Sequence, residues 1–202
     1  MLRRLSIPWR TTACVLLCAT LAPQLAQARA RAFDAGGVAG AQGRYGVVFP
    51  VSSAEPNPAI TPGALDARVT QATIRSTICV PGYTRGIRPP ERYTERLKRE
   101  GIRAYGYSDR RLRDYEEDHL ISLELGGSPD SPRNLWPQPH HVIGGWGSYA
   151  KDRLENRLHR LVCRGRLSLA QAQYDIRHDW IAAYRKYVGP RPQARRGHGY
   201  AG

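Results

Sequence analysis

The sequence lacks the motifs that would assign a common chemistry outright. It contains no HExxH zinc motif, no glycine-rich phosphate-binding loop and no residues in the order of a Ser-His-Asp triad. Its four cysteines include no CxxC pair, so a zinc knuckle is disfavoured. No internal repeat is found. These absences leave metalloproteases, P-loop enzymes and serine hydrolases without support in the sequence.

Long apolar runs are also scarce, and the longest lies near the N-terminus. Arginines within the first ten residues come before an apolar stretch that Pro23 interrupts, and the small-residue sequence Ala26-Gln27-Ala28 follows. This is the layout of a secretory signal peptide, and the stretch is too short for a good membrane span. We expect residues 1–28 to be a signal peptide. The mature protein is then periplasmic or secreted, with no stable membrane insertion.

Acidic residues are outnumbered, with 17 against 31 basic residues and a net charge of +14. Signal cleavage removes three arginines and no acid, which leaves +11. Such a charge favours a polyanionic partner, namely nucleic acid, an anionic membrane surface or a phosphate-rich polymer. Many of the arginines lie on predicted solvated helix faces, so charge alone does not choose among these partners.

Few cysteines remain in the mature chain, because cleavage removes Cys14 and Cys18. In an oxidising compartment, the remaining Cys79 and Cys163 most simply form one disulfide. Closing so long a loop stabilises a fold by about 4 kcal/mol in the chain-entropy model. Two buried free thiols are the alternative.

Composition divides the rest of the chain into three segments. Residues 29–66 are rich in Gly, Ala, Ser and Pro and are predicted to be a disordered linker. Residues 67–188 form the predicted folded domain, a small and mainly helical α+β domain. Residues 189–202 are predicted to be a flexible basic tail. Within the domain, we expect a short helix over 69–80 and a helix over 91–100 that Gly101 stops.

The middle of the domain predicts a strand, a turn, a second strand and then helices. Residues 115–125 predict a strand, because His119, Ile121, Leu123 and Leu125 alternate with Leu120, Ser122 and Glu124. Gly126-Gly127 then marks a turn, and residues 134–137 predict a short return strand. An apolar stripe from Ala150 to Val162 indicates a helix. A last helix is predicted from Ser168, whose pairing with Gln171 is a capping-box pattern, to Tyr187.

Two sequence runs in this region resemble a known family. They are DHLISLELGG, beginning at Asp118, and NLWP, beginning at Asn134. Together they resemble the HNH-like, or ββα-metal, nuclease family. More loosely, the segment from Thr77 to the final helix looks like a group of exported, mostly uncharacterised bacterial proteins with this core. The resemblance implies a ββα-metal hairpin-helix core and an endonuclease activity.

The resemblance also implies roles for individual residues. His119 is the expected general base, because a neutral imidazole suits proton abstraction from water. Asp118 is an expected metal ligand, since hard divalent cations prefer carboxylate oxygens and suit phosphate chemistry. Asn134 is expected to orient His119 or to hold the loop that bears it. The implied cofactor is a divalent metal ion, Mg²⁺ first, with Mn²⁺, Ca²⁺ or Zn²⁺ as alternatives.

The sequence departs from the family pattern at the second metal ligand. The family usually has a His or Asn near the start of the helix, where this chain has Gly147, Ser148 and Tyr149. We predict Asp152, one turn further along, as the second ligand. The alternatives are Glu155, Asn156, His140 and His141.

These features predict an exported, divalent-metal-dependent endonuclease that hydrolyses phosphodiester bonds of DNA, with RNA as a second substrate class. Arg110, Arg111 and Arg113, just before the first strand, are candidate phosphate contacts or a solvated charge run. Glu116 and Glu117 are either further ligands or a balance to these arginines. The competing functions are a non-catalytic nucleic-acid-binding module and an envelope interaction protein, both on a degenerate HNH-like fold.

Overall fold

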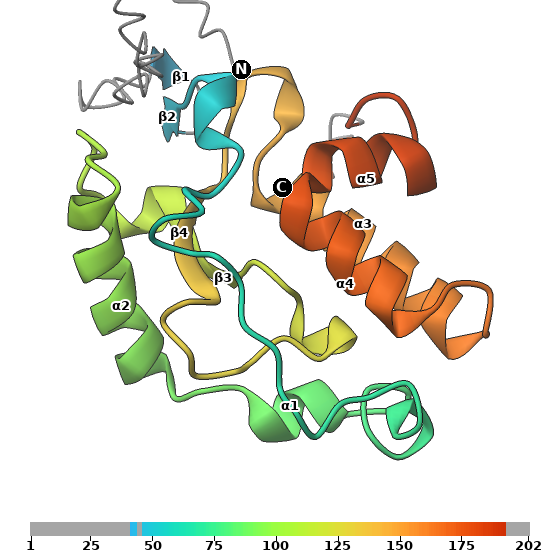
Figure 1. Cartoon of the computed structure of the whole chain (residues 1–202). Helices are drawn as coiled ribbons and strands as arrows, with labels where there is room; N and C mark the ends of the chain where they lie inside the picture. Colours follow the sequence, from blue (N-terminus) through green and yellow to red (C-terminus); the bar gives the residue numbers. More distant parts are fainter. Residues whose placement is uncertain (1–40, 44–45, 193–202) are drawn as a thin grey trace, which may run out of the picture. The chain divides into compact units, whose positions relative to one another are not determined.

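The structure is a computed structural model that describes residues 41–43 and 46–192, and these form a mixed α+β fold (Figure 1). In this part of the chain the strands form two antiparallel pairs. One pair is β1 (Ala41–Gly43) with β2 (Gly46–Val48), and the other is β3 (Tyr115–His119) with β4 (Leu135–Pro139). The predicted signal peptide and residues 193–202 of the predicted tail lie outside the described residues.

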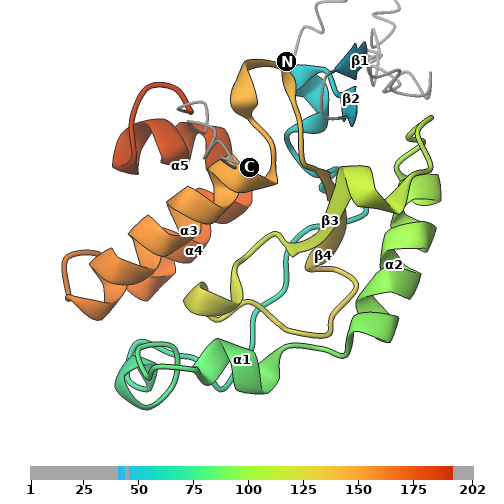
Figure 2. The same ribbon diagram turned by 180° about the vertical axis from the view of Figure 1, so that it is seen from behind.

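The β3–β4 hairpin lies between helices. Helix α2 (Glu91–Ala104) packs on both strands, and the short α1 (Tyr83–Ile87) comes just before it in the chain. On the other side of the hairpin are α3 (Ser148–Cys163), α4 (Leu169–His178) and α5 (Trp180–Tyr187), coloured orange to red in Figures 1 and 2. Helix α3 packs against α5 and against η4 (Leu123–Leu125), a 3₁₀ turn that follows β3. None of the described helices is long and apolar enough to cross a membrane.

Strand β3 is shorter than the alternation predicted, because it ends at His119 rather than near residue 125. Leu120, Ile121 and Leu123 are all buried, so successive residues do not alternate between core and solvent. Ser122 instead accepts a hydrogen bond from the Glu124 N–H (3.2 Å) and begins the turn η4. The return strand β4 is confirmed, although it extends to Pro139.

Asn134 and the glycine pair hold the loop between the two strands. The Asn134 Oδ1 accepts the N–H of Ile121 at 3.0 Å, and its Nδ2 donates to the carbonyls of Ile121 and Ser128, both at 3.0 Å. A Cβ atom on Gly127 would lie 1.7 Å from the Ile121 carbonyl oxygen and 2.8 Å from the Asn134 Nδ2. Only glycine fits this close approach, so the Gly-Gly turn and Asn134 form one packed unit.

The predicted disordered linker is wrong for residues 46–66. Phe49 is fully buried in the core, and it forms a parallel bridge with Val142. The Phe49 N–H donates to the His141 carbonyl at 2.8 Å, and the Ile143 N–H donates to the Phe49 carbonyl at 2.9 Å. The segment is rich in turn residues, but its few apolar side chains are buried, and this burial orders it. Residues 29–40 and 44–45 of the predicted linker lie outside the described part.

Three helix predictions need correction. Helix α2 does not end at Gly101 but continues to Ala104. A Cβ atom on Gly101 would lie 2.8 Å from the Pro137 Cδ, so the glycine permits close packing of the helix on β4. The expected helix over 69–80 is a set of turns around the 3₁₀ segment η2 (Ile74–Ser76). The single final helix is two, because the extended backbone of Asp179 separates α4 from α5. The Asp179 side chain caps α5 by accepting the Ala182 N–H at 2.7 Å.

The predicted disulfide is confirmed. Cys79 and Cys163 are bonded, with their Cα atoms 5.6 Å apart and a sequence separation of 84. The bond joins the segment after η2 to the C-terminal end of α3. Ser168 is confirmed as the N-cap of α4, where its Oγ accepts the Gln171 N–H at 3.2 Å.

Candidate functional site

A polar cavity of about 240 Å³ lies where the end of β3 meets η4 and α3. Its wall carries His119 and an unusual number of carboxylates. The acidic residues are Glu116 and Asp118 from β3, Glu124 from η4, and Asp152 and Glu155 from α3. Arg88 and Asn156 also line it. The cavity thus brings together residues that are up to 72 positions apart in sequence, from Thr84 to Asn156.

The His119 ring is held in one orientation. Its Nε2 lies 2.8 Å from the Pro129 carbonyl oxygen, and a carbonyl only accepts hydrogen bonds. The Nε2 therefore carries the ring proton, which leaves the lone pair on Nδ1. Burial lowers the His119 pKa, against the opposing effects of the Pro129 hydrogen bond and the Asp118 charge. A neutral ring with an unprotonated Nδ1 has the form that a general base requires.

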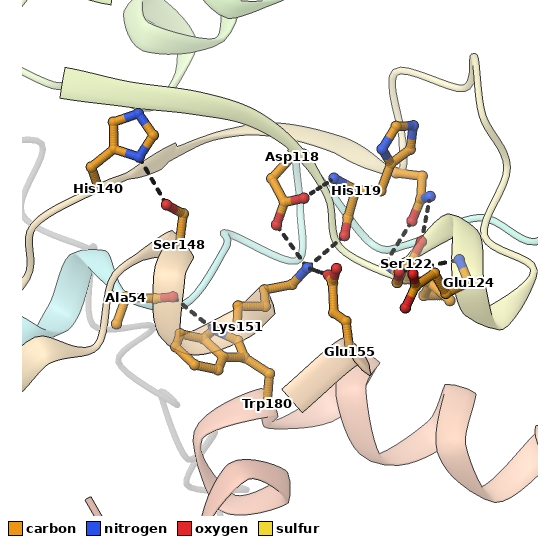
Figure 3. Close-up of polar contacts among 12 residues, drawn as sticks. Ala54, Asp118, His119, Ser122, Glu124, His140, Ser148, Lys151, Glu155 and Trp180 are labelled. Carbon is orange, nitrogen blue, oxygen red and sulfur yellow. Dashed lines mark hydrogen bonds and ion pairs between the residues drawn. The ribbon is translucent and has the colours of Figure 1, made fainter. Parts of the chain in front are cut away.

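Lys151 connects the strand end to α3, as Figure 3 shows. Its side chain is fully buried, and its Nζ donates to the Asp118 Oδ2 and to the His119 carbonyl, both at 2.7 Å. The third N–H of the ammonium donates to the carboxylate of Glu155, which lies one turn along the same helix. All three N–H groups of the ammonium are thereby used. Lys151 is a positioning residue that fixes the backbone at Asp118 and His119.

The charges around Lys151 do not balance. Burial alone would lower the Lys151 pKa, but the charges and hydrogen bonds of Asp118 and Glu155 raise it, so the amine stays protonated. Burial raises the pKa of Glu155. Burial, followed by the negative charges of Asp118 and Asp152, raises the pKa of Glu116 to about 7. One lysine therefore does not neutralise the carboxylates, and the cavity favours further positive charge.

The structure places the predicted site residues in two groups. Asp118, His119 and Asp152 line the cavity, and so do the alternative ligands Glu155 and Asn156. Asn134 is fully buried behind it and holds the loop rather than the imidazole, since its side-chain hydrogen bonds go to main-chain groups.

The alternative ligands His140 and His141 are not in the cavity wall. The His140 Nδ1 lies 2.8 Å from the Ser148 Oγ, and its ring stacks on Tyr149 with centroids 5.3 Å apart. Of the acidic pair before Asp118, Glu116 lines the cavity and Glu117 does not.

The cavity suits a hard cation that keeps part of its water. Its oxygen donors are those that Mg²⁺ and Mn²⁺ prefer, and Mg²⁺ is commonly held by one or two carboxylates plus waters and phosphate. Both Asp118 oxygens already have a donor, His119 N–H at 2.8 Å and Lys151, although each keeps a second lone pair. Among the described residues, no three of the His, Asp and Glu side chains of this cavity have ligand atoms that all lie within 4.8 Å of one another. The spacing therefore does not suit a cage formed by protein atoms alone.

Lys151 was missed by sequence reasoning, although the sequence carries a signal. Lys151, Leu154, Leu158 and Val162 follow one another at steps of three and four residues, and all four are buried. A lysine on the buried stripe of a helix must have an anionic partner, since an unpaired buried charge is very costly. Glu155, four residues away, was the visible candidate for that partner.

No family model matches the chain, and the comparisons with curated proteins and with solved structures found no match. A functional assignment therefore depends on the residues of the cavity and on their chemistry.

Proposed function

We propose that the protein is an exported, divalent-metal-dependent endonuclease that hydrolyses phosphodiester bonds of DNA, with RNA as a second substrate class. The observation that carries this function is the anchored His119 ring, whose Nδ1 lone pair is left for a proton in a cavity walled by carboxylates. The order β3, β4, α3 agrees with the hairpin and helix of the ββα-metal family that the Asp118-His119 and Asn134 motifs resemble.

We assign a separate role in the reaction to each of these residues. The His119 Nδ1 takes the proton of the attacking water. Lys151 and Asn134 keep the strand end and its loop in place. Asp118 and Asp152 would hold the cation, which supplies charge neutralisation at the phosphate oxygens and the leaving oxygen. The carboxylates of the cavity wall, which the buried Lys151 does not neutralise, would otherwise repel a phosphate group.

Exposed arginines suit a polyanionic substrate, and one of them lies in the cavity wall. Arg88 is exposed and lines the cavity, and Arg110 and Arg113 are exposed just before β3. Guanidinium groups match phosphate oxygens in geometry and charge. Arg111 differs from its neighbours, because it pairs with Asp109 (3.0 Å) and Asp114 (2.9 Å).

The test is digestion of supercoiled plasmid by the purified exported protein. With Mg²⁺ or Mn²⁺ we expect nicking that EDTA abolishes and that His119→Ala slows by about 10²- to 10⁴-fold. His178→Ala is the matched control, since that exposed histidine lies on α4, bonded to the Tyr174 carbonyl, and should leave cutting unchanged. A folded protein that leaves the plasmid uncut, or equal cutting by His119→Ala, overturns the proposal.

One observation favours a non-catalytic nucleic-acid-binding module as the second candidate. The helix residue that contacts Asp118 is a cation, Lys151, and not a metal ligand. Under this alternative, gel-shift assays show DNA binding that EDTA and Asp152→Asn leave unchanged, and no cutting accompanies it.

A further inference from the structure

A second group of potential metal ligands lies at the far end of α3, around the disulfide. His159 and Cys163 are four residues apart on the helix and so lie on one face, and Cys79 joins them from the segment after η2. One ligand atom from each of these three residues lies within 4.8 Å of the other two. All three residues are only partly buried, so solvent and ions reach them.

The His159 ring is already oriented as metal-binding histidines usually are. Its Nε2 lies 2.8 Å from the Ile78 carbonyl oxygen and therefore carries the proton. The lone pair is then on Nδ1. Metal-ligating histidines commonly donate their other ring N–H to a backbone carbonyl in this way, which fixes the ring and its tautomer.

A fourth donor faces the same histidine. The Glu124 Oε2 lies 3.9 Å from the His159 Nδ1. This oxygen is buried and has no hydrogen-bond partner. A buried carboxylate oxygen left without a donor is costly, and a cation beside the Nδ1 would satisfy it.

We propose that the reduced chain binds Zn²⁺ through Cys79, Cys163 and His159, with Glu124 completing a tetrahedral shell. Two thiolates, one imidazole and one carboxylate are a donor set that favours Zn²⁺ over the hard cations proposed for the cavity. The site shares Glu124 with the cavity wall, but it uses none of His119, Asp118 and Asp152, which carry the proposed function, so each proposal stands without the other. In the oxidised chain the two sulfurs are bonded to each other and the site is closed.

Opening the site requires a balanced two-electron step. The disulfide accepts two electrons and two protons and becomes two thiols. A phosphine reductant supplies the electrons and is itself oxidised to the phosphine oxide, with its oxygen taken from water. Binding of Zn²⁺ then releases both thiol protons to solvent, so affinity should rise with pH.

The test uses the full chain, reduced with a phosphine under exclusion of oxygen and titrated with Co²⁺ as a coloured substitute for Zn²⁺. We expect thiolate-to-cobalt absorption in the reduced chain, its loss when Zn²⁺ is added, and none in the oxidised chain. Cys79→Ser should abolish the absorption. His159→Gln should weaken binding by at least about tenfold. Glu124→Gln should weaken it by less, and His178→Gln should have no effect.

Circular dichroism keeps the test decisive if reduction loosens the fold. Helical signal that falls on reduction and returns with Zn²⁺ supports the site, and so does tight binding by a chain that stays folded. The proposal is overturned if reduced and oxidised chains bind Co²⁺ alike. It is also overturned if His159→Gln binds as tightly as the natural chain, because two thiolates alone then account for the binding.

Discussion

Replacing Lys151 by methionine removes the ammonium that bridges Asp118 and Glu155. Methionine nearly fills the volume of the lysine stem, so the substitution leaves little empty space and tests the charge itself. The two carboxylates then face each other in a buried position, and the His119 carbonyl loses its donor. Breaking a buried ion pair by removing one partner costs about 3–5 kcal/mol. Glu155 can offset part of this cost by taking up a proton, so we expect a loss of about 3 kcal/mol in the free energy of unfolding.

Urea unfolding followed by circular dichroism, with the disulfide intact, measures this loss. Lys186→Met is the matched control, because Lys186 pairs with Asp175 at 3.0 Å with more than half of its side chain exposed. An exposed pair of this kind contributes at most about 1 kcal/mol. Adding Glu155→Gln to Lys151→Met should recover part of the lost stability. If Lys151→Met costs no more than Lys186→Met, the ammonium does not hold the strand end to α3 and the account of Lys151 is wrong.

Three further predictions concern other parts of the fold. Asn134→Ala loses three hydrogen bonds to the loop main chain, each of which contributes about 1 kcal/mol. The free energy of unfolding in urea should therefore fall by about 3 kcal/mol, and a fall of less than about 1 kcal/mol contradicts this role. Burial raises the pKa of Glu55 from its ordinary 4.5 to about 8, so its contribution to stability is complete below pH 4.5 and is lost as pH rises to 8. Glu55→Gln keeps the acceptor for the Ile181 N–H (3.3 Å). The variant should be more stable than the natural chain by on the order of 2 kcal/mol at pH 8.5, but not at pH 4. If the variant and the natural chain have equal urea midpoints at both pH values, this account of Glu55 is wrong. Reduction of the disulfide without added metal should lower the free energy of unfolding by about 4.6 kcal/mol, because the bond closes a loop of 84 residues. An unchanged urea midpoint would refute this value.

Local signals in the sequence were sufficient for the elements that depend on neighbouring residues. The turn at Gly126-Gly127, the return strand, the stripe of α3 and the Ser168 cap follow from spacing and from turn chemistry. The disulfide followed from counting the cysteines outside the predicted signal peptide. Asp118, His119 and Asp152 line one cavity because the hairpin is followed directly by α3, and that order is visible in the sequence.

Features that depend on contacts between distant residues could not be predicted from local sequence patterns. Glycine is typical of a helix end, yet Gly101 lies inside α2 and allows the helix to pack closely against Pro137, a residue 36 positions away. Residues 46–66 have the composition of a linker, but contacts with distant residues order them, such as the packing of Phe49 beside Val142 and the hydrogen bond from Trp180 to the Ala54 carbonyl. Asp179 interrupts an apolar period that continues on both sides of it, and its capping role required the three-dimensional structure.

Chemical rescue tests the role of His119 most directly. His119→Gly leaves a space beside Asp118 that an added imidazole molecule can enter from the cavity. We predict that this variant, folded and supplied with Mg²⁺, cuts plasmid at least about a hundredfold more slowly than the natural chain. Added imidazole should restore cutting in proportion to its concentration, while it should leave Asn134→Ala unchanged. Cutting by His119→Gly at the natural rate without imidazole would contradict the assignment of His119 as the base.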